Sequence, residues 1–138
     1  MARSSLQGAR TDALLLLGRL CLAALFLQAG YAKLMGWPGI VHLLQRLHAP
    51  LPGPGGIVAI VCELGAGALI ALGWETRIAS ALLIAFIAGA TWLAHRFWLM
   101  HGHAAFEAEI NFYKNVALAG GFLLLIAAGP GRFSIDRG

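Results

Sequence analysis

Four long apolar segments constrain the fold of this chain more than any other feature of its sequence. They cover residues 13–35, 56–73, 78–94 and 112–128. A helix needs about 17–25 residues to cross the hydrocarbon core of a bilayer, so each segment is long enough, or nearly so, to span it. A water-soluble domain of 138 residues could not bury four such segments in one core. The chain is therefore expected to be an integral membrane protein.

The amino-acid composition supports a membrane protein of one domain. Hydrophobic residues make up 59% of the chain and charged residues only 12%, whereas charged residues make up about a quarter of a typical soluble domain. The net charge is +4, but the cations are scattered, and no basic run that would bind nucleic acid is present. These cations are expected to meet the anionic headgroups of the lipid bilayer.

The predicted fold class is all-α, an antiparallel bundle of four transmembrane helices that forms a single domain over residues 1–138. In the first loop, apolar residues from Ile40 to Leu47 recur with helical spacing, which predicts a short amphipathic helix in the membrane interface at 38–48. The stretch 50–56, rich in proline and glycine, is expected to be a turn without helix. The four transmembrane helices are predicted at about residues 13–35, 56–73, 77–98 and 112–128.

Four spans place both termini on one side of the membrane. Arg3 and Arg10 precede the first apolar segment, but this segment contains Arg19 and is too long for a signal peptide, so we interpret it as an uncleaved helix. The terminal side carries five lysine or arginine residues and the other side four. Because cytoplasmic loops are richer in these residues, the count favours termini in the cytoplasm.

Polar residues from all four spans are predicted to meet in one half of the bundle. Glu63 lies seven positions into the second span, roughly 10 Å deep at about 1.5 Å per residue. On the antiparallel first span this depth corresponds to Gln28, with Lys33 nearer the surface. The third span leaves the membrane on the same side, and the fourth re-enters there. The residues expected around the resulting pocket are Gln28, Lys33, Glu63, His95, Arg96, Asn111, Lys114 and Asn115.

Glu63 is the most informative of these residues, because a carboxylate at that depth is strongly disfavoured unless it is protonated or paired. Lys33 or Lys114 can reach it, and His95 can hydrogen-bond to it. One interpretation is an ion pair that fixes the register of the helices, and the other is a pocket for a small polar or redox-active ligand. The two interpretations are compatible. Arg19 lies alone in the opposite half and is expected to extend to the cytoplasmic surface.

The histidine-rich outer loop gives a weaker signal. His101 and His103, with Glu107 and Glu109 nearby, offer ligands for zinc or copper. Their spacing fits no specific motif, so a solvated polar loop is favoured and no residue is assigned to a metal.

The two cysteines and the missing motifs narrow the chemistry further. Cys21 and Cys62 fall inside apolar segments and are expected to be small buried side chains, with a disulfide between them left open. The sequence contains no phosphate-binding loop, dinucleotide-binding glycine fingerprint, nucleophile elbow or haem attachment motif. Because no redox centre is visible in the sequence, the electrons for any redox reaction are expected to come from a partner protein.

Several short motifs, taken in their order along the chain, resemble the DoxX family of small four-helix membrane proteins. No single motif decides this, but their order over nearly the whole chain makes the resemblance specific. The matching segments are 18–19, 28–34, 63–67, 76–77, 95–98, 111–115, 120–121 and 129–136.

The resemblance implies a multi-pass protein of the bacterial inner membrane and a link to redox chemistry. Members of the family are associated with membrane redox systems, including a thiosulfate:quinone oxidoreductase, and relatives in the wider superfamily act as cargo receptors or assembly chaperones. Most residues on which the family pattern falls are also selected by the depth argument. The family pattern falls on Arg19, Lys33, Glu63, Arg77, His95, Arg96, Asn111, Lys114 and Asn115. All of these except Arg19 and Arg77 belong to the depth group.

The function expected from both lines of reasoning is a membrane subunit of a redox system that binds a quinone-like headgroup, and hence a candidate component of a quinone-linked oxidoreductase. Glu63 and His95 are expected to transfer protons. A protein partner in a redox complex is expected, and the sequence does not decide whether the protein forms an oligomer. Two alternatives remain: a non-enzymatic scaffold or assembly partner, and metal handling through the histidine-rich loops. The residues expected to bind the ligand are Gln28, Lys33, Arg96, Asn111, Lys114 and Asn115.

Overall fold

The computed structural model describes the backbone of residues 2–136 and the side chains of residues 7–136. Within this part of the chain the regular structure is entirely helical, and four segments are long and apolar enough to cross a membrane. The predicted all-α bundle of four spans is therefore confirmed. The four segments are Gln7–Met35, Pro52–Leu72, Thr76–Leu99 and Gly102–Ala128.

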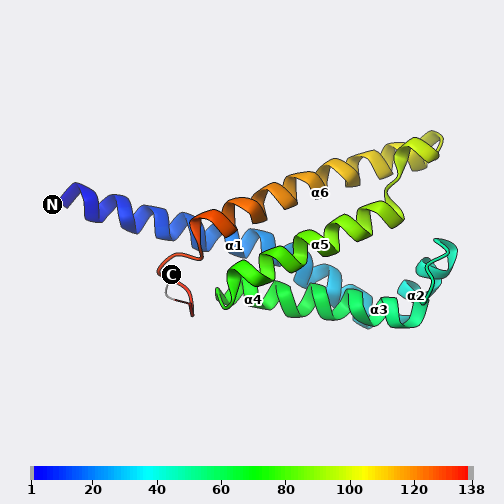
Figure 1. Ribbon diagram of the computed structural model, residues 1–138, viewed down its shortest axis with the longest axis horizontal. Coiled ribbons are helices and arrows are strands. Elements are labelled where there is room, and N and C mark those ends of the chain that lie inside the picture. Colours follow the sequence, from blue (N-terminus) through cyan, green and yellow to red (C-terminus); the bar gives the residue numbers. More distant parts are fainter. Residues whose placement is uncertain (1, 137–138) are drawn as a thin grey trace.

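The second span is one continuous rod made of three helical pieces, and the two chain ends lie at the same end of the bundle (Figure 1). Toward the opposite end, where the short helix α2 lies, the hairpin of α5 and α6 diverges from α1 and α3 (Figure 1). The elements are α1 (Ala2–Met35), α2 (Trp37–Arg46), α3 (Pro52–Val61), a π-helix (Cys62–Ala66), α4 (Gly67–Leu72), α5 (Thr76–Ala94), a 3-10 turn (Phe97–Leu99) and α6 (Gly102–Ala128).

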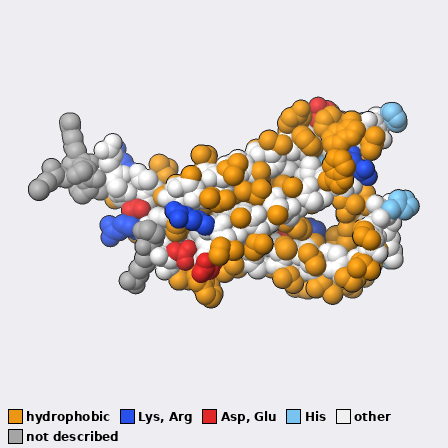
Figure 2. Space-filling model, in the orientation of Figure 1, with side chains coloured by type: hydrophobic (Ala, Val, Ile, Leu, Met, Phe, Trp, Pro, Cys, Tyr) orange, Lys and Arg blue, Asp and Glu red, His pale blue; other side chains and the backbone are white. Residues whose placement is uncertain are grey.

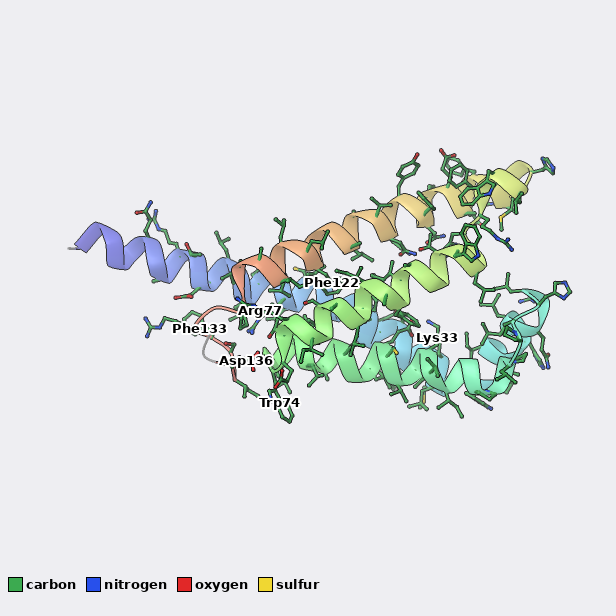
Figure 3. The ribbon with its side chains drawn as sticks, in the orientation of Figure 1. Lys33, Trp74, Arg77, Phe122, Phe133 and Asp136 are labelled. Carbon is green, nitrogen blue, oxygen red and sulfur yellow. The ribbon has the colours of Figure 1, made fainter. Side chains whose placement is uncertain are left out.

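An apolar core joins the four spans. Phe26 of α1, Ile70 of α4, Leu83 of α5 and Phe122 of α6 are each 5% exposed or less and belong to one cluster. The rings of Phe26 and Phe122 lie 5.6 Å apart between centroids. Burial of such side chains holds the bundle together in its middle, where Figure 3 labels Phe122.

Two stretches expected to be irregular are helical instead. The second span begins at Pro52 rather than at residue 56, so the turn predicted over 50–56 is wrong. A helix tolerates proline in its first turn because those N–H groups have no partner within the helix. The fourth span begins at Gly102 rather than at 112. Alanine and glutamate residues between these two positions favour helix strongly, so α6 extends beyond its apolar segment.

The predicted amphipathic helix in the first loop is confirmed as α2. Ile40 is buried, whereas His42, Gln45 and Arg46 are exposed. Trp37 packs against the start of the second span, where a Cβ atom at Gly56 would lie 3.2 Å from its ring. The apolar face of α2 is thereby held against α3.

Arg19 is buried at the end of the bundle that holds the chain ends, with 1% of its surface exposed. Its Nη2 atom donates a hydrogen bond to the backbone carbonyl of Phe133, in the tail that follows α6. The expectation that Arg19 extends to the surface is therefore wrong. The tail folds back over the bundle and supplies the acceptor that water would otherwise provide.

The same tail is hydrogen-bonded to the turn between α4 and α5. The backbone N–H of Ile135 donates to the carbonyl of Leu72 at 3.2 Å, and that of Asp136 donates to the carbonyl of Gly73 at 3.0 Å. Gly73 has a φ of +67°, and a Cβ atom there would lie 1.7 Å from Arg19 Nη1. Only glycine fits this position, between the buried guanidinium group and the tail.

Asp136 caps the start of α5. Its carboxylate accepts hydrogen bonds from the backbone N–H groups of Glu75 at 3.0 Å and Thr76 at 3.1 Å. These two donors, Thr76 foremost, hold the pKa of the Asp136 carboxyl group below its ordinary value of 3.8, because they bind the ionised form. Figure 3 shows Asp136 and Phe133 at one end of the bundle and Lys33 in the other half.

Replacement of this carboxylate, Asp136→Asn, is expected to lower the melting temperature of the detergent-solubilised protein at neutral pH and to change it little in acid. Because folding lowers the pKa of Asp136, its stabilising contribution is fully present above the ordinary value of 3.8 and is lost as the pH falls through the lower pKa of the folded protein. The difference in melting temperature between wild type and variant should shrink from about pH 6 to about pH 3. A difference that stays constant would show that this charge does not hold the tail.

Candidate functional site

An ion pair inside the membrane-spanning part of the bundle is the starting point of the site. Lys33 lies in the last turn of α1, and Glu63 lies in the π-helix, near the middle of the span Pro52–Leu72. The Nζ atom of Lys33 lies 2.8 Å from each carboxylate oxygen of Glu63. The Glu63 side chain is 7% exposed and that of Lys33 27%. The Lys33 side chain thus reaches Glu63, which is one of the two pairings expected from the sequence.

The backbone around Glu63 departs from an ordinary α-helix. Residues Cys62–Ala66 form a π-helix, a rare conformation that often marks a functional position. Gly30 of α1 packs against this turn, where a Cβ atom would lie 2.8 Å from Leu64 Cγ and 3.0 Å from Glu63 Cβ. The missing side chain at Gly30 lets α1 approach the π-helix closely, so that Lys33 is near enough to pair with Glu63. Neither the π-helix nor the close approach of α1 was predicted from the sequence. Gly30, within the segment 28–34, is the residue that could have indicated the close approach.

A cavity of about 710 Å³ lies beside the ion pair. Helices α1, α2 and α3 form one side of it, and α5 and α6 form the other. Figure 2 shows the hollow between these two parts, with a lysine or arginine side chain visible inside it. Most of the wall is apolar. Phe26 belongs both to the core and to this wall, so the core closes the cavity on the side of the chain ends.

The opposite side of the cavity carries a second group of polar residues. His95 follows the last residue of α5, and Lys114 and Asn115 lie on α6. The amide of Asn115 donates a hydrogen bond to Thr91 Oγ1 at 2.8 Å, which ties α6 to α5. The ammonium group of Lys114 donates to Asn111 Oδ1 at 2.6 Å. Polar groups from both halves of the bundle therefore face one apolar cavity.

The structure brings five of the eight expected residues to the cavity wall and leaves three away from it. Gln28 is exposed on another face of α1. Arg96 lies over the ring of Trp92, with its Cζ atom 5.7 Å from the ring centroid. Asn111 lies off the wall, where its oxygen accepts a hydrogen bond from Lys114 and its Nδ2 donates one to the backbone carbonyl of Glu107 at 2.9 Å. The five residues on the wall are Lys33, Glu63, His95, Lys114 and Asn115.

Helix α2 is the part of the cavity that sequence reasoning did not include. Its residues Ile40, Leu43 and Leu44, with Leu47 directly after the helix, line the cavity on the side opposite α5 and α6. The signal was present, since these are the residues whose spacing predicts an amphipathic helix. An apolar helix face needs something to cover it, and here part of that face borders the cavity.

Among the described residues, the histidines and cysteines form no metal or disulfide site. In the described part of the chain, no group of three histidine, cysteine, aspartate or glutamate side chains is placed to hold a metal ion. His103 and Glu107 lie one helical turn apart on the exposed surface of α6, with Nδ1 3.6 Å from Oε1. Cys21 and Cys62 are both free. Cys21 is exposed on α1 and Cys62 is half-buried, so neither is fully buried as expected.

Comparison with known proteins assigns the family. The DoxX family model matches residues 14–96, which is more than half of the chain. The chain belongs to the DoxX family. The resemblance drawn from its motifs is thus confirmed, and with four helices that can span a membrane this DoxX protein is an integral membrane protein.

Two proteins of Escherichia coli K12 are similar to this DoxX protein over most of their length. Inner membrane protein YphA is 42% identical over 130 residues, which cover 94% of this chain and 93% of that protein. Inner membrane protein YqjF is 34% identical over 132 residues, which cover 91% and 92%. A Surfeit locus protein 4 homolog of Schizosaccharomyces pombe is 24% identical over 83 residues, covering 59% of this chain and 28% of that protein. No solved structure matches the chain.

Removing one partner of the buried ion pair is expected to cost more stability than removing both. Lys33→Met leaves a carboxylate with 7% of its side chain exposed and no cation, which should cost about 3–5 kcal/mol of the free energy of unfolding. The double variant Lys33→Met/Glu63→Met replaces the pair by apolar side chains and should recover most of that loss. Thermal unfolding of wild type, both single variants and the double variant in a non-ionic detergent measures the coupling. If the losses of the single variants simply add, the pair is not coupled.

Proposed function

We propose that this DoxX protein is an inner-membrane component of a redox system and that its cavity binds a membrane-soluble amphiphile with a quinone-like head. One observation carries the proposal: an apolar cavity of about 710 Å³ with ionisable groups facing it from separate helices. Ligand pockets typically measure about 300–1,000 Å³ and combine apolar walls with a few polar groups that orient the ligand. The names of the two E. coli relatives support an inner-membrane location.

The proposed roles of the polar residues follow from their positions on the wall. Lys114 and Asn115 lie on the α6 side and can hydrogen-bond ring oxygens of the head. Glu63 and His95 lie on opposite sides of the cavity and are the groups able to exchange protons with a bound quinol. Asn111 holds the ammonium group of Lys114 at 2.6 Å and acts as a positioning residue. A partner protein supplies or accepts the electrons.

The apolar residues of α2 fit the ligand's hydrocarbon chain. The quinones of membranes carry such a chain, which gains free energy wherever it is kept from water. Leu43, Leu44 and Leu47 present an apolar surface to the cavity, next to the segment that joins α2 to α3. The polar head would then lie toward the ion pair and the chain toward α2.

Filling the cavity from α5 tests the proposal directly. Gly89 lines the cavity, and a Cβ atom there would meet no other atom within 4 Å. A short-chain ubiquinone such as decylubiquinone should raise the melting temperature of the wild type. At a hundred times its dissociation constant, a bound ligand adds about 2.7 kcal/mol to the free energy of unfolding. Gly89→Leu should abolish this shift without altering a polar group.

The matched control for this test is Gly18→Leu. Gly18 also has open space around its Cβ position but lies on α1 outside the cavity wall. This variant should keep the full shift. A wild type that shows no stabilisation by the quinone, or equal shifts in both leucine variants, would contradict the proposal.

A non-enzymatic scaffold is the second candidate, and the ion pair itself favours it. Lys33 and Glu63 tie α1 to the second span at 2.8 Å whether or not a ligand binds. In this view the pair fixes the helices, and the bundle serves as an assembly partner for another membrane protein.

The substitution Glu63→Gln separates the two candidates. If the cavity binds quinone, the variant should remain folded, because the amide can still accept a hydrogen bond from Lys33, and should lose the quinone-dependent rise in melting temperature. A scaffold role predicts a lower melting temperature of the variant and no quinone-dependent rise in either protein. Glu109→Gln, an exposed position on α6 outside the cavity, provides the control for loss of one acidic charge.

A further inference from the structure

The charges around the cavity do not balance. Lys33 and Glu63 neutralise each other at 2.8 Å. Lys114 also lines the cavity, yet among the described residues no carboxylate lies within 4.0 Å of its ammonium group. Its acceptor there is the neutral oxygen of Asn111. The wall therefore carries the excess positive charge of Lys114.

The ammonium group of Lys114 has the capacity to bind a further acceptor. A lysine carries three N–H donors, and Asn111 Oδ1 occupies one of them at 2.6 Å. This contact also fixes the direction of the side chain along α6. His95 and Asn115 border the same side of the cavity, so a ligand oxygen near Lys114 would lie beside two more polar groups.

The apolar surroundings make the charge of the ligand matter. Lys114 is exposed along part of its surface, but it also borders a mostly apolar wall, where a cation gains more from a nearby anion than it does in open water. A hydrogen bond from an ammonium group is charge-assisted with either acceptor, but an anionic oxygen adds a Coulomb attraction to the cation. A neutral quinone oxygen would leave this attraction unused.

We propose that the cavity selects a quinone whose head carries an ionised acidic hydroxyl group, with Lys114 as the counter-ion. This inference rests on the proposed function, because it requires the cavity to be the ligand site, and it adds the charge of the head. A hydroxyl group next to a quinone carbonyl is acidic because the resulting negative charge is shared with the ring oxygens. The ion pair of Lys33 and Glu63 stays intact and adds no net charge.

A matched pair of ligands tests this inference. The probes are 2-hydroxy-3-undecyl-1,4-naphthoquinone, which is ionised at neutral pH, and its 2-methoxy ether, which cannot ionise. Binding to the full-length wild-type protein in a non-ionic detergent is measured by the ligand-dependent shift in melting temperature and by native mass spectrometry. The hydroxy compound is expected to bind about tenfold or more tightly than the ether, the preference that one charge-assisted contact gives.

Three variants locate the source of the preference. Lys114→Gln should reduce it to about threefold or less, because the cation that attracts the ionised head is gone and glutamine offers only a neutral donor. Lys114→Arg keeps the charge and should keep the preference. Arg132→Gln removes one exposed cation outside the cavity wall and should leave the preference unchanged.

The possible outcomes distinguish this inference from the proposed function. If neither naphthoquinone nor decylubiquinone binds the wild type, the cavity is not a quinone site and both fail. If the hydroxy compound and its ether bind equally well, or if Lys114→Gln keeps the full preference, the inference fails while the proposed function stands. A preference that Lys114→Arg keeps and Lys114→Gln loses supports the inference.

Discussion

A carboxylate in the middle of a membrane span has to be neutralised, and the rest of this structure is arranged around that requirement. Lys33 meets both oxygens of Glu63 at 2.8 Å, which is possible because Gly30 lets α1 approach the π-helix closely. The pair therefore joins the first two spans at the place where the bundle begins to open. The ion pair thus places Glu63 beside an apolar cavity while its negative charge stays neutralised by Lys33.

The two ends of the bundle differ because their polar groups find different partners. At the end that holds the chain termini, the tail binds Arg19 through Nη2 and caps α5 through Asp136, although Nε and Nη1 of Arg19 have no hydrogen-bond partner among the described residues. At the other end α5 and α6 diverge from the first two spans (Figure 1), and His95 and Lys114 line the cavity. The tail thus covers one end of the bundle, while the other end contains the cavity.

The position of a residue along a span gives its depth in the membrane but not the face of the helix that it occupies. Gln28 and Lys33 lie at similar depths, yet five residues along a helix turn the side chain by roughly 140°, so only one of them faces the cavity. Arg96 was placed correctly along the chain, but the ring of Trp92 beside it is a better partner than the cavity. The helix limits near Pro52 and Gly102 were missed because helices extend beyond their apolar segments.

The sequence by itself determined that this is a membrane protein of four helices with a buried acid and several cations in one half. The length of the apolar segments and their charge content can be read from the chain alone. Together they predict helices, because a segment that crosses a bilayer has to form its own backbone hydrogen bonds. Only the tertiary structure decided that Lys33 rather than Lys114 pairs with Glu63, that the tail buries Arg19, and that α2 borders the cavity. These depend on how far the helices rotate and diverge, which follows from side-chain packing between segments distant in the sequence.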